Sequence, residues 1–166
     1  MRTRILWRNV ISVKGKFLAL VLLLVAIAAC SRLPALTPAI LEQAEHKWQA
    51  QRPDFYRLVI DMSGDRVETG RFEAVVRSGQ VVSLRRNGLV IMPGRGNDYS
   101  MDGLFRMLQQ ELGLAEKPAM LGAPPGYTVY TTAQFDENTG RLIHYRRVVG
   151  GASNSIDVRV LEYENQ

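Results

Sequence analysis

Residues that could perform acid–base or nucleophilic chemistry are few in this chain of 166 residues. His46 and His144 are the only histidines, and their separation fits neither the HxxxH nor the HExxH spacing of a metal site. A Ser-His-Asp triad could be drawn only from loop and strand residues, namely Ser153 or Ser155, His144, and Asp136 or Asp157. No GxSxG motif accompanies these serines, so we expect turns there rather than a nucleophile. The sequence therefore predicts no catalytic residue, metal or cofactor, and a hydrolase that uses His144 is an alternative.

The N-terminal segment has the pattern of a secretory signal peptide. The run Phe17–Ala29 is entirely apolar and follows five cations, which are Arg2, Arg4, Arg8, Lys14 and Lys16. The run is shorter than the roughly 20 apolar residues that a membrane-spanning helix needs, and Ser31, Arg32 and Pro34 oppose its extension. A basic start, a short apolar region and small residues at the exit are typical of signal peptides. The pattern predicts a cleaved signal peptide over 1–29, with a single-pass signal anchor as the alternative.

Cys30, the only cysteine, follows this run directly. The residues Ile27, Ala28, Ala29 and Cys30 resemble the lipobox of bacterial lipoproteins. The resemblance implies cleavage before Cys30, acylation of its sulfur and new amino group, and membrane attachment through those acyl chains. Several chains on one residue are needed because a single chain binds a membrane only marginally. We therefore expect an envelope protein facing the periplasm or the exterior, and Ser31 after Cys30 favours the outer membrane by analogy with enteric sorting.

The net charge of +5 comes from the leader alone. Of the 21 lysines and arginines, five precede Cys30, which leaves 16 to balance the 16 aspartates and glutamates that all follow it. A mature chain without net charge lacks the basic excess that nucleic-acid binding requires. We therefore expect no nucleic-acid partner, a short tether over 30–36, and one domain over 37–166.

Two helices are predicted from caps and periodicity. Thr37-Pro38 opens the first, which ends before Arg52-Pro53. Its expected core-facing stripe is Ile40, Leu41, Ala44 and Trp48. Ser100 caps the second helix, and Gly113 suits its C-terminal cap.

Alternation of apolar and polar residues predicts the strands, at about 55–62, 71–77, 81–86, 89–92, 127–135, 141–148 and 156–163. Their short connections, such as Ser78-Gly79-Gln80 and Asn87-Gly88, favour antiparallel pairing. Two one-sided helices and a one-sided sheet bury their apolar faces against each other. The predicted fold is a two-layer α+β domain, mainly an antiparallel sheet of about six to seven strands packed against two helices.

A set of short motifs runs through this domain. They are Trp48, Phe55-Tyr56-Arg57-Leu58, the segment from Ser100 to Phe105, Phe135-Asp136 with Gly140, and Leu161-Glu162-Tyr163. Together they resemble a domain-of-unknown-function family of small secreted bacterial proteins and lipoproteins, over roughly His46 to Tyr163. That family typically continues Gly-aromatic-Pro after the turn, where this chain has Gly140-Arg141-Leu142. The resemblance implies neither a reaction nor catalytic residues.

The remaining candidates lie on the predicted outward face of the sheet. This face is expected to carry Glu73, Arg86 and Tyr130 and a candidate partner surface of Arg57, Arg71, Arg77 and Arg146. Arginine and tyrosine are favoured at interface hot spots, although an antiparallel sheet routinely leaves one face in water. The leading hypothesis is a lipid-anchored, non-enzymatic envelope module that binds a protein or envelope component through its sheet face or an edge strand.

Overall fold

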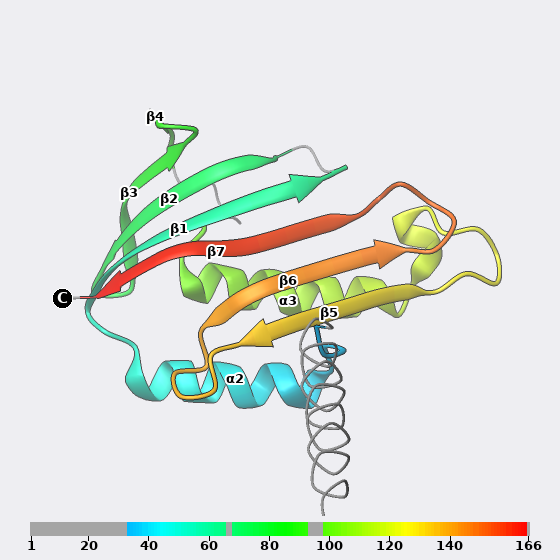
Figure 1. Ribbon diagram of the computed structural model, residues 1–166, viewed down its shortest axis with the longest axis horizontal. Helices are drawn as coiled ribbons and strands as arrows, with labels where there is room; N and C mark the ends of the chain where they lie inside the picture. The colour runs from blue at the N-terminus through cyan, green and yellow to red at the C-terminus, as the bar shows by residue number, and fades with distance from the viewer. Residues whose placement is uncertain (1–32, 66–67, 93–97, 166) are drawn as a thin grey trace, which may run out of the picture. The chain divides into compact units, whose positions relative to one another are not determined.

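A computed structural model describes residues 33–65, 68–92 and 98–165. Residues from Pro34 onward form one compact unit, a seven-stranded antiparallel sheet with two α-helices (Figure 1). The predicted α+β fold is confirmed.

The helices are α2 (Pro38–Gln51), α3 (Met101–Ala115) and the short 3-10 helix η1 (Pro118–Leu121). The strands are β1 (Phe55–Gly64), β2 (Gly70–Arg77), β3 (Gln80–Arg86), β4 (Leu89–Val90), β5 (Val129–Phe135), β6 (Leu142–Val149) and β7 (Ile156–Asn165). Their order across the sheet is β4-β3-β2-β1-β7-β6-β5. Both halves of the sheet are thus meanders that meet where β1 pairs with β7.

Both helices pack on one face of the sheet, which we call the inner face (Figure 1). Strand β1 turns Tyr56, Leu58, Ile60 and Met62 to this face, and β2 alternates in the same register. The pairing of β1 with β7 shifts register between Val59 and Ile60. These side chains join the helices in one core cluster. The opposite face, the outer face, has no helix among the described residues.

The start of α2 follows the predicted cap. Thr37 accepts a hydrogen bond from the Ile40 amide at 3.3 Å, and the helix buries Leu41, Ala44 and Trp48. The prediction that Ile40 also faces the core is wrong, because its side chain is 37% exposed. At 100° per residue Ile40 lies at the margin of the stripe centred between Leu41 and Ala44. Its side chain therefore does not pack against the sheet.

Helix α3 begins as predicted and ends later. The Ser100 hydroxyl accepts the Gly103 amide at 2.9 Å. The expectation of a C-terminal cap at Gly113 is wrong, since the helix continues to Ala115 and Glu116 caps it in a right-handed conformation. Glycine inside a helix costs about 1 kcal/mol, and continuation lets Leu114 pack against a second apolar cluster around Leu121.

The two edges of the sheet differ. Edge strand β5 is covered by the segment before α2: the Leu36 amide donates to Thr131 at 2.9 Å and the Ala133 amide to Pro34 at 3.0 Å. At the other edge β4 pairs only with Arg85 and Arg86 of β3. Within the described residues, the rest of β3 has no neighbouring strand on the edge that faces away from β2.

Candidate functional site

The predicted lipidation site lies outside the described residues. Cys30 and the lipobox residues Ile27, Ala28 and Ala29 precede residue 33, where the description begins. In the part of the chain that is described, no helix has the length and apolar character that crossing a membrane requires.

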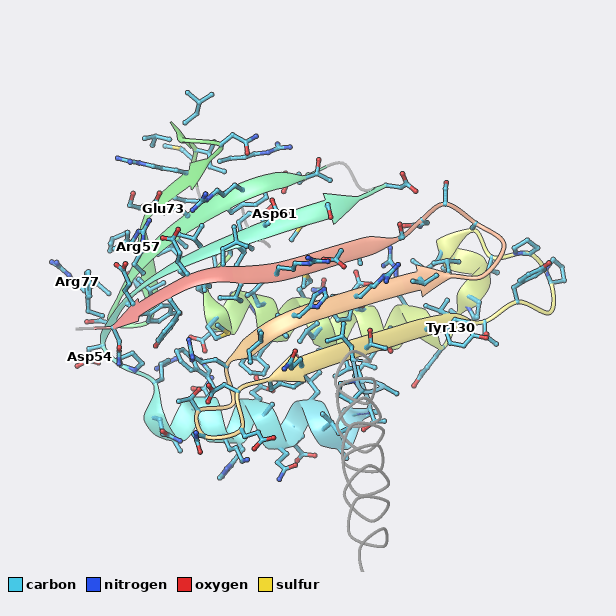
Figure 2. All side chains as sticks on the ribbon, viewed as in Figure 1. Asp54, Arg57, Asp61, Glu73, Arg77 and Tyr130 are labelled. Carbon is cyan, nitrogen blue, oxygen red and sulfur yellow. The ribbon has the colours of Figure 1, made fainter. Side chains whose placement is uncertain are left out.

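The four arginines of the candidate partner surface all lie on the outer face, as the alternation in β1, β2 and β6 requires. Arg57 is already engaged, with Nε 2.9 Å from Glu73 and Nη1 2.9 Å from Glu162. Arg71 also reaches Glu162, at 2.6 Å. Hydrogen bonds to Glu73 and then to Glu162 raise the pKa of Arg57, and a hydrogen bond from Arg57 lowers the pKa of Glu162. The centre of the outer face is therefore neutralised within the chain (Figure 2).

Other outward arginines lack such partners. Arg77, Arg85 and Arg146 form no ion pair with any described residue, and Arg77 lies over the Phe55 ring at 5.7 Å. Two of the three, Arg77 and Arg85, belong to β2 and β3 beside the open edge. Two of these three unpaired arginines thus lie on the β2–β3 side of the outer face.

Arg86 does not belong to the outer face, so its predicted position is wrong. It shares the inner side of β3 with Leu84 and stands over the Phe72 ring at 5.6 Å. Its Nη2 donates to the Thr69 carbonyl at 2.7 Å. A register shift in the β2–β3 pair between Val75 and Val76 decides which β3 residues face inward, and the alternation of the sequence does not reveal such a bulge.

The open edge is also apolar, which the sequence reading missed. Four large side chains are exposed along β3, β4 and the residues after them: Val82 (59%), Leu89 (73%), Val90 (75%) and Met92 (90%). We call these four residues the edge patch. The sequence signal is the apolar run Leu89–Met92 after the Asn87-Gly88 turn, which by itself predicts only a short strand. A strand that has no further neighbour leaves such residues in water.

His144 and Asp157 do meet, on the outer face. The His144 Nε2 lies 3.0 Å and 3.1 Å from the two Asp157 oxygens, and Arg159 donates to Asp157 at 2.9 Å. Burial alone would raise the pKa of Asp157, but hydrogen bonds from His144 and Arg159 outweigh it and hold that pKa below its usual range. Within the described residues no serine hydroxyl bonds to His144. His144, Asp157 and Arg159 thus form a hydrogen-bonded network on the outer face.

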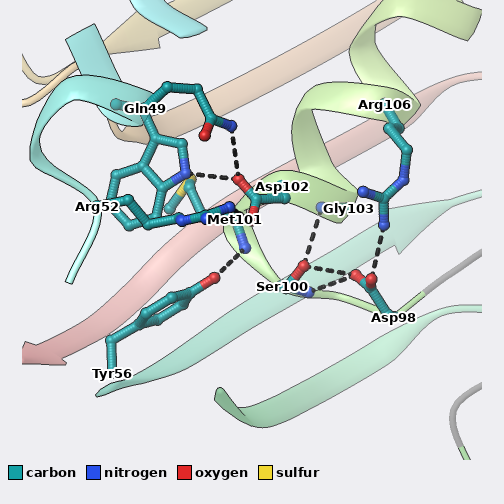
Figure 3. Close-up of polar contacts among 10 residues, drawn as sticks. Gln49, Arg52, Tyr56, Asp98, Ser100, Met101, Asp102, Gly103 and Arg106 are labelled. Atoms are coloured by element: carbon teal, nitrogen blue, oxygen red, sulfur yellow. Dashed lines mark hydrogen bonds and ion pairs between the residues drawn. The ribbon is translucent and has the colours of Figure 1, made fainter. Parts of the chain in front are cut away.

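A polar junction between the helices was not foreseen. Asp102, in the first turn of α3, accepts hydrogen bonds from the Trp48 indole at 2.8 Å, from Gln49 at 3.0 Å and from Arg52 at 2.9 Å (Figure 3). Tyr56 adds a bond from the Met101 amide to its hydroxyl at 3.1 Å. Burial raises the pKa of Tyr56, so the hydroxyl stays protonated. These contacts unite the Trp48, Tyr56 and Ser100–Phe105 motifs in a structural role.

A buried ion pair is the second polar feature that the sequence reading missed. Arg147 on β6 and Glu111 on α3 are 0% and 1% exposed, and Arg147 Nη1 contacts the Glu111 carboxylate. Arg147 Nη2 also donates to the Asn154 side chain at 2.7 Å, and the Asn154 amide donates to the Leu121 carbonyl at 3.2 Å. Arg147 lies two residues after buried Tyr145, so strand alternation places both side chains on the inner face. That alternation is the sequence signal for a buried arginine.

The described residues contain no group of three or more His, Cys, Asp or Glu side chains that could hold a metal ion. In comparisons with known proteins, no family model matches the chain and no curated protein matches it significantly. The resemblance to the domain-of-unknown-function family therefore stays a prediction.

Proposed function

We propose that this protein is a lipid-anchored, non-enzymatic binding module of the bacterial cell envelope. Its partner is an extended, acidic segment of another envelope protein, which it binds along β3 and β4. The carrying observation is the edge patch, four large apolar side chains exposed on an edge with no neighbouring strand among the described residues. The lipobox residues supply the anchoring half of the proposal.

The contrast between the two edges supports docking at β3. Natural sheets shield their edge strands by covering them, shortening them or charging them. The chain covers β5 with residues 34–36, but among the described residues it leaves Gln80–Ser83 of β3 without a partner on the side away from β2. An added strand would gain main-chain hydrogen bonds there and would cover Val82, which is the β-augmentation mode of peptide recognition.

Charge decides which partner fits. The segment Gln80–Met92 contains two arginines and no carboxylate, and Arg77 and Arg85 stand unpaired beside it on the outer face. A partner segment that carries carboxylates would neutralise them. A second copy of the same edge would bring no carboxylate of its own, so self-pairing gains no ion pairs.

Binding of a defined probe to the full-length chain in zwitterionic detergent tests the proposal. The probe is a fluorescent peptide of alternating valine and glutamate, compared with one of alternating valine and lysine. We expect only the acidic peptide to bind, and Arg85→Glu to weaken it by roughly tenfold or more. The matched control is Arg146→Glu, an equally unpaired outward arginine on β6. Equal binding of both peptides, or equal effects of both substitutions, would overturn the proposal.

Self-association is tested by the mass of the particle in solution. If the wild type is a dimer and Val82→Lys is a monomer, the partner at this edge is a second copy of the chain and not an acidic segment of another protein. A monomer in both forms agrees with the proposal.

An envelope hydrolase that uses His144 is the second candidate, favoured by the His144–Asp157 contact. Its test is hydrolysis of chromogenic esters by the full chain and by His144→Ala. Activity that disappears in the variant would support a hydrolase, and an inactive wild type would exclude this route.

A further inference from the structure

The segment before α2 is a fixed part of the domain and not a free linker. The Leu36 amide donates to the Thr131 carbonyl at 2.9 Å, and the Ala133 amide donates to the Pro34 carbonyl at 3.0 Å. The Leu36 side chain is 5% exposed and belongs to the core. Residues 34–36 therefore join the chain to the domain at edge strand β5.

Membrane attachment through Cys30, which the proposed function includes, would hold β5 close to the lipid. Cys30 precedes Pro34 by four residues, and four fully extended residues span at most about 14 Å. The same limit applies to a signal anchor, because the apolar run of the leader ends at Ala29. Either anchor therefore keeps the edge of the sheet at β5 near the bilayer surface.

Large apolar and aromatic side chains are exposed around the beginning of β5. Tyr130 of β5 is 64% exposed, and Val148, its cross-strand neighbour on β6, is 37% exposed (Figure 2). Tyr127, in the loop before β5, is 54% exposed, and Met120 of η1 is 68% exposed. Tyrosine is enriched at the headgroup level of membranes, because its ring is apolar and its hydroxyl is polar. These residues therefore have the composition of a membrane-interface surface.

The loop that carries Tyr127 is held against the turn between β6 and β7. The Gly150 amide donates to the Thr128 carbonyl at 3.0 Å, and a Cβ added at Gly150 would lie 3.0 Å from the Tyr127 ring. The Tyr127 amide donates to the Pro124 carbonyl at 3.1 Å. Tyr127 is thus positioned by the fold although its side chain is exposed, so docking on a surface would order it little further.

The same region has positive charge and no carboxylate. Residues 117–135 and strand β6 contain no Asp or Glu. Lys117 and Arg146 are exposed, and neither side chain forms an ion pair with a described residue. Asp157, which lies opposite Arg146 on β7, is engaged by two other side chains. Lysine and arginine near a membrane surface attract anionic lipids.

We propose that these residues dock on the surface of an anionic phospholipid bilayer. The lipid-facing surface consists of Lys117, Met120, Tyr127, Tyr130 and Arg146. Its tyrosines and methionine would enter the headgroup region, and its two cations would lie against lipid phosphates. The inference rests on the membrane attachment in the proposed function, but not on peptide docking at β3.

Docking at β5 determines where the proposed binding edge lies. The strand order separates β5 from β3 by five strand spacings. At about 4.8 Å per spacing, the two strands are roughly 24 Å apart. A bilayer that contacts the β5 side would therefore leave the edge patch away from the lipid, where a partner can approach it.

Fluorescence quenching by lipids tests the docking. The full-length chain, purified from native membranes, is reconstituted in vesicles of phosphatidylglycerol and phosphatidylethanolamine that include a lipid spin-labelled at its headgroup. Bimane is attached in Tyr127→Cys or Tyr130→Cys, and in Val82→Cys of β3 as the control, while labelled wild type gives the background from Cys30. We expect quenching at positions 127 and 130 and none at position 82, which lies roughly 24 Å farther across the sheet.

Flotation of the vesicles separates the two proposals. A chain that does not float with the vesicles would overturn the membrane attachment and the docking together. A chain that floats but shows equal quenching at all three positions, or none at 127 and 130, would overturn the docking alone. Unchanged quenching in vesicles of phosphatidylcholine would contradict the anionic character of the partner.

Charge substitutions locate the surface. Arg146→Glu and Lys117→Glu, each combined with bimane at Tyr130→Cys, should lower the ratio of docked to undocked chains by roughly fivefold or more. Arg85→Glu, an equally unpaired outward arginine on β3, should leave this ratio unchanged. Equal effects of Arg85→Glu and Arg146→Glu would contradict the assignment. The two arginines thus exchange roles relative to the peptide test, which contains no lipid.

Discussion

The indole nitrogen of Trp48 lies 2.8 Å from a carboxylate oxygen of Asp102, which ties the C-terminal half of α2 to the first turn of α3. Trp48 is 1% exposed and its ring meets Tyr56 edge-to-face at 5.4 Å, so the donor is held rigidly. A carboxylate in the first turn of a helix is also favoured by the helix dipole. One acidic residue thus accepts a hydrogen bond from a buried indole and joins the two helices to each other.

We predict that Asp102→Ala destabilises the fold by about 1–3 kcal/mol, because the buried indole N–H loses its acceptor. Urea unfolding of the full chain measures the change. Glu45→Ala is the control, since it removes the exposed Gln109–Glu45 contact between the same helices and should cost less than about 0.5 kcal/mol. Equal losses in both variants would contradict the role assigned to Asp102.

We expect Glu111→Leu to lower the free energy of unfolding more than a double substitution that removes both members of the ion pair. The single change leaves the Arg147 guanidinium buried without its carboxylate, a situation that costs about 3–5 kcal/mol. In the double variant Glu111→Leu/Arg147→Met no buried charge remains, so part of that stability should return. Denaturant unfolding of the two single variants and the double variant gives the coupling. If the stability loss in the double variant equals the sum of the losses in the two single variants, Glu111 and Arg147 contribute independently of each other, contrary to this prediction.

The Asp136 turn predicts a pH dependence. Asp136 accepts the Thr139 amide at 2.8 Å, the Thr139 hydroxyl at 2.9 Å and the Asn138 amide at 3.1 Å. The Thr139 bonds, amide first, hold the pKa of Asp136 below its usual range. A lowered folded pKa stabilises the protein above the unfolded carboxylate value of about 3.9, and this stability is lost as the pH falls through the folded pKa.

The stability difference between wild type and Asp136→Asn should therefore be largest near neutral pH and should shrink below about pH 4. Urea unfolding at several pH values follows it. Glu137→Gln, the exposed neighbour, should show no such change, and a difference that is constant with pH would rule out the ionised Asp136.

Alanine substitutions at Gly140 and Gly126 distinguish the cost of backbone strain from the cost of steric crowding. Both have positive φ angles, +72° and +85°, but an added Cβ at Gly140 would lie 2.1 Å from the Ala44 carbonyl oxygen, whereas at Gly126 it would meet nothing within 4 Å. Gly126→Ala should cost about 1–2 kcal/mol from the left-handed conformation alone. Gly140→Ala should cost clearly more, about 3 kcal/mol or above, because the β5–β6 turn must move away from α2. Thermal melting of both variants compares them directly.

The intact mass of the protein extracted from native bacterial membranes tests the anchor. We expect a chain that begins at Cys30 with added acyl mass, and a Cys30→Ser variant without lipid. A full-length mass without lipid would instead indicate the signal anchor.

Local signals in the sequence were sufficient for the elements of this fold. Thr37-Pro38 and Ser100 cap their helices, and alternation set the inward faces of β1 and β2, because these properties depend on neighbouring residues only. The outward positions of Arg57, Arg71, Arg77 and Arg146 followed from the same period of two.

Tertiary structure decided what those residues contact. A bulge between β2 and β3 turned Arg86 inward, and packing of Leu114 carried α3 past Gly113. The order of the strands determined which edge stayed open, and the approach of α3 to β1 and β7 created a cavity lined by Met62, Leu104 and Ile156. Each of these features depends on contacts between residues far apart in the chain. The periodicity and the capping residues that predict each element depend on neighbouring residues only, so they do not predict such contacts.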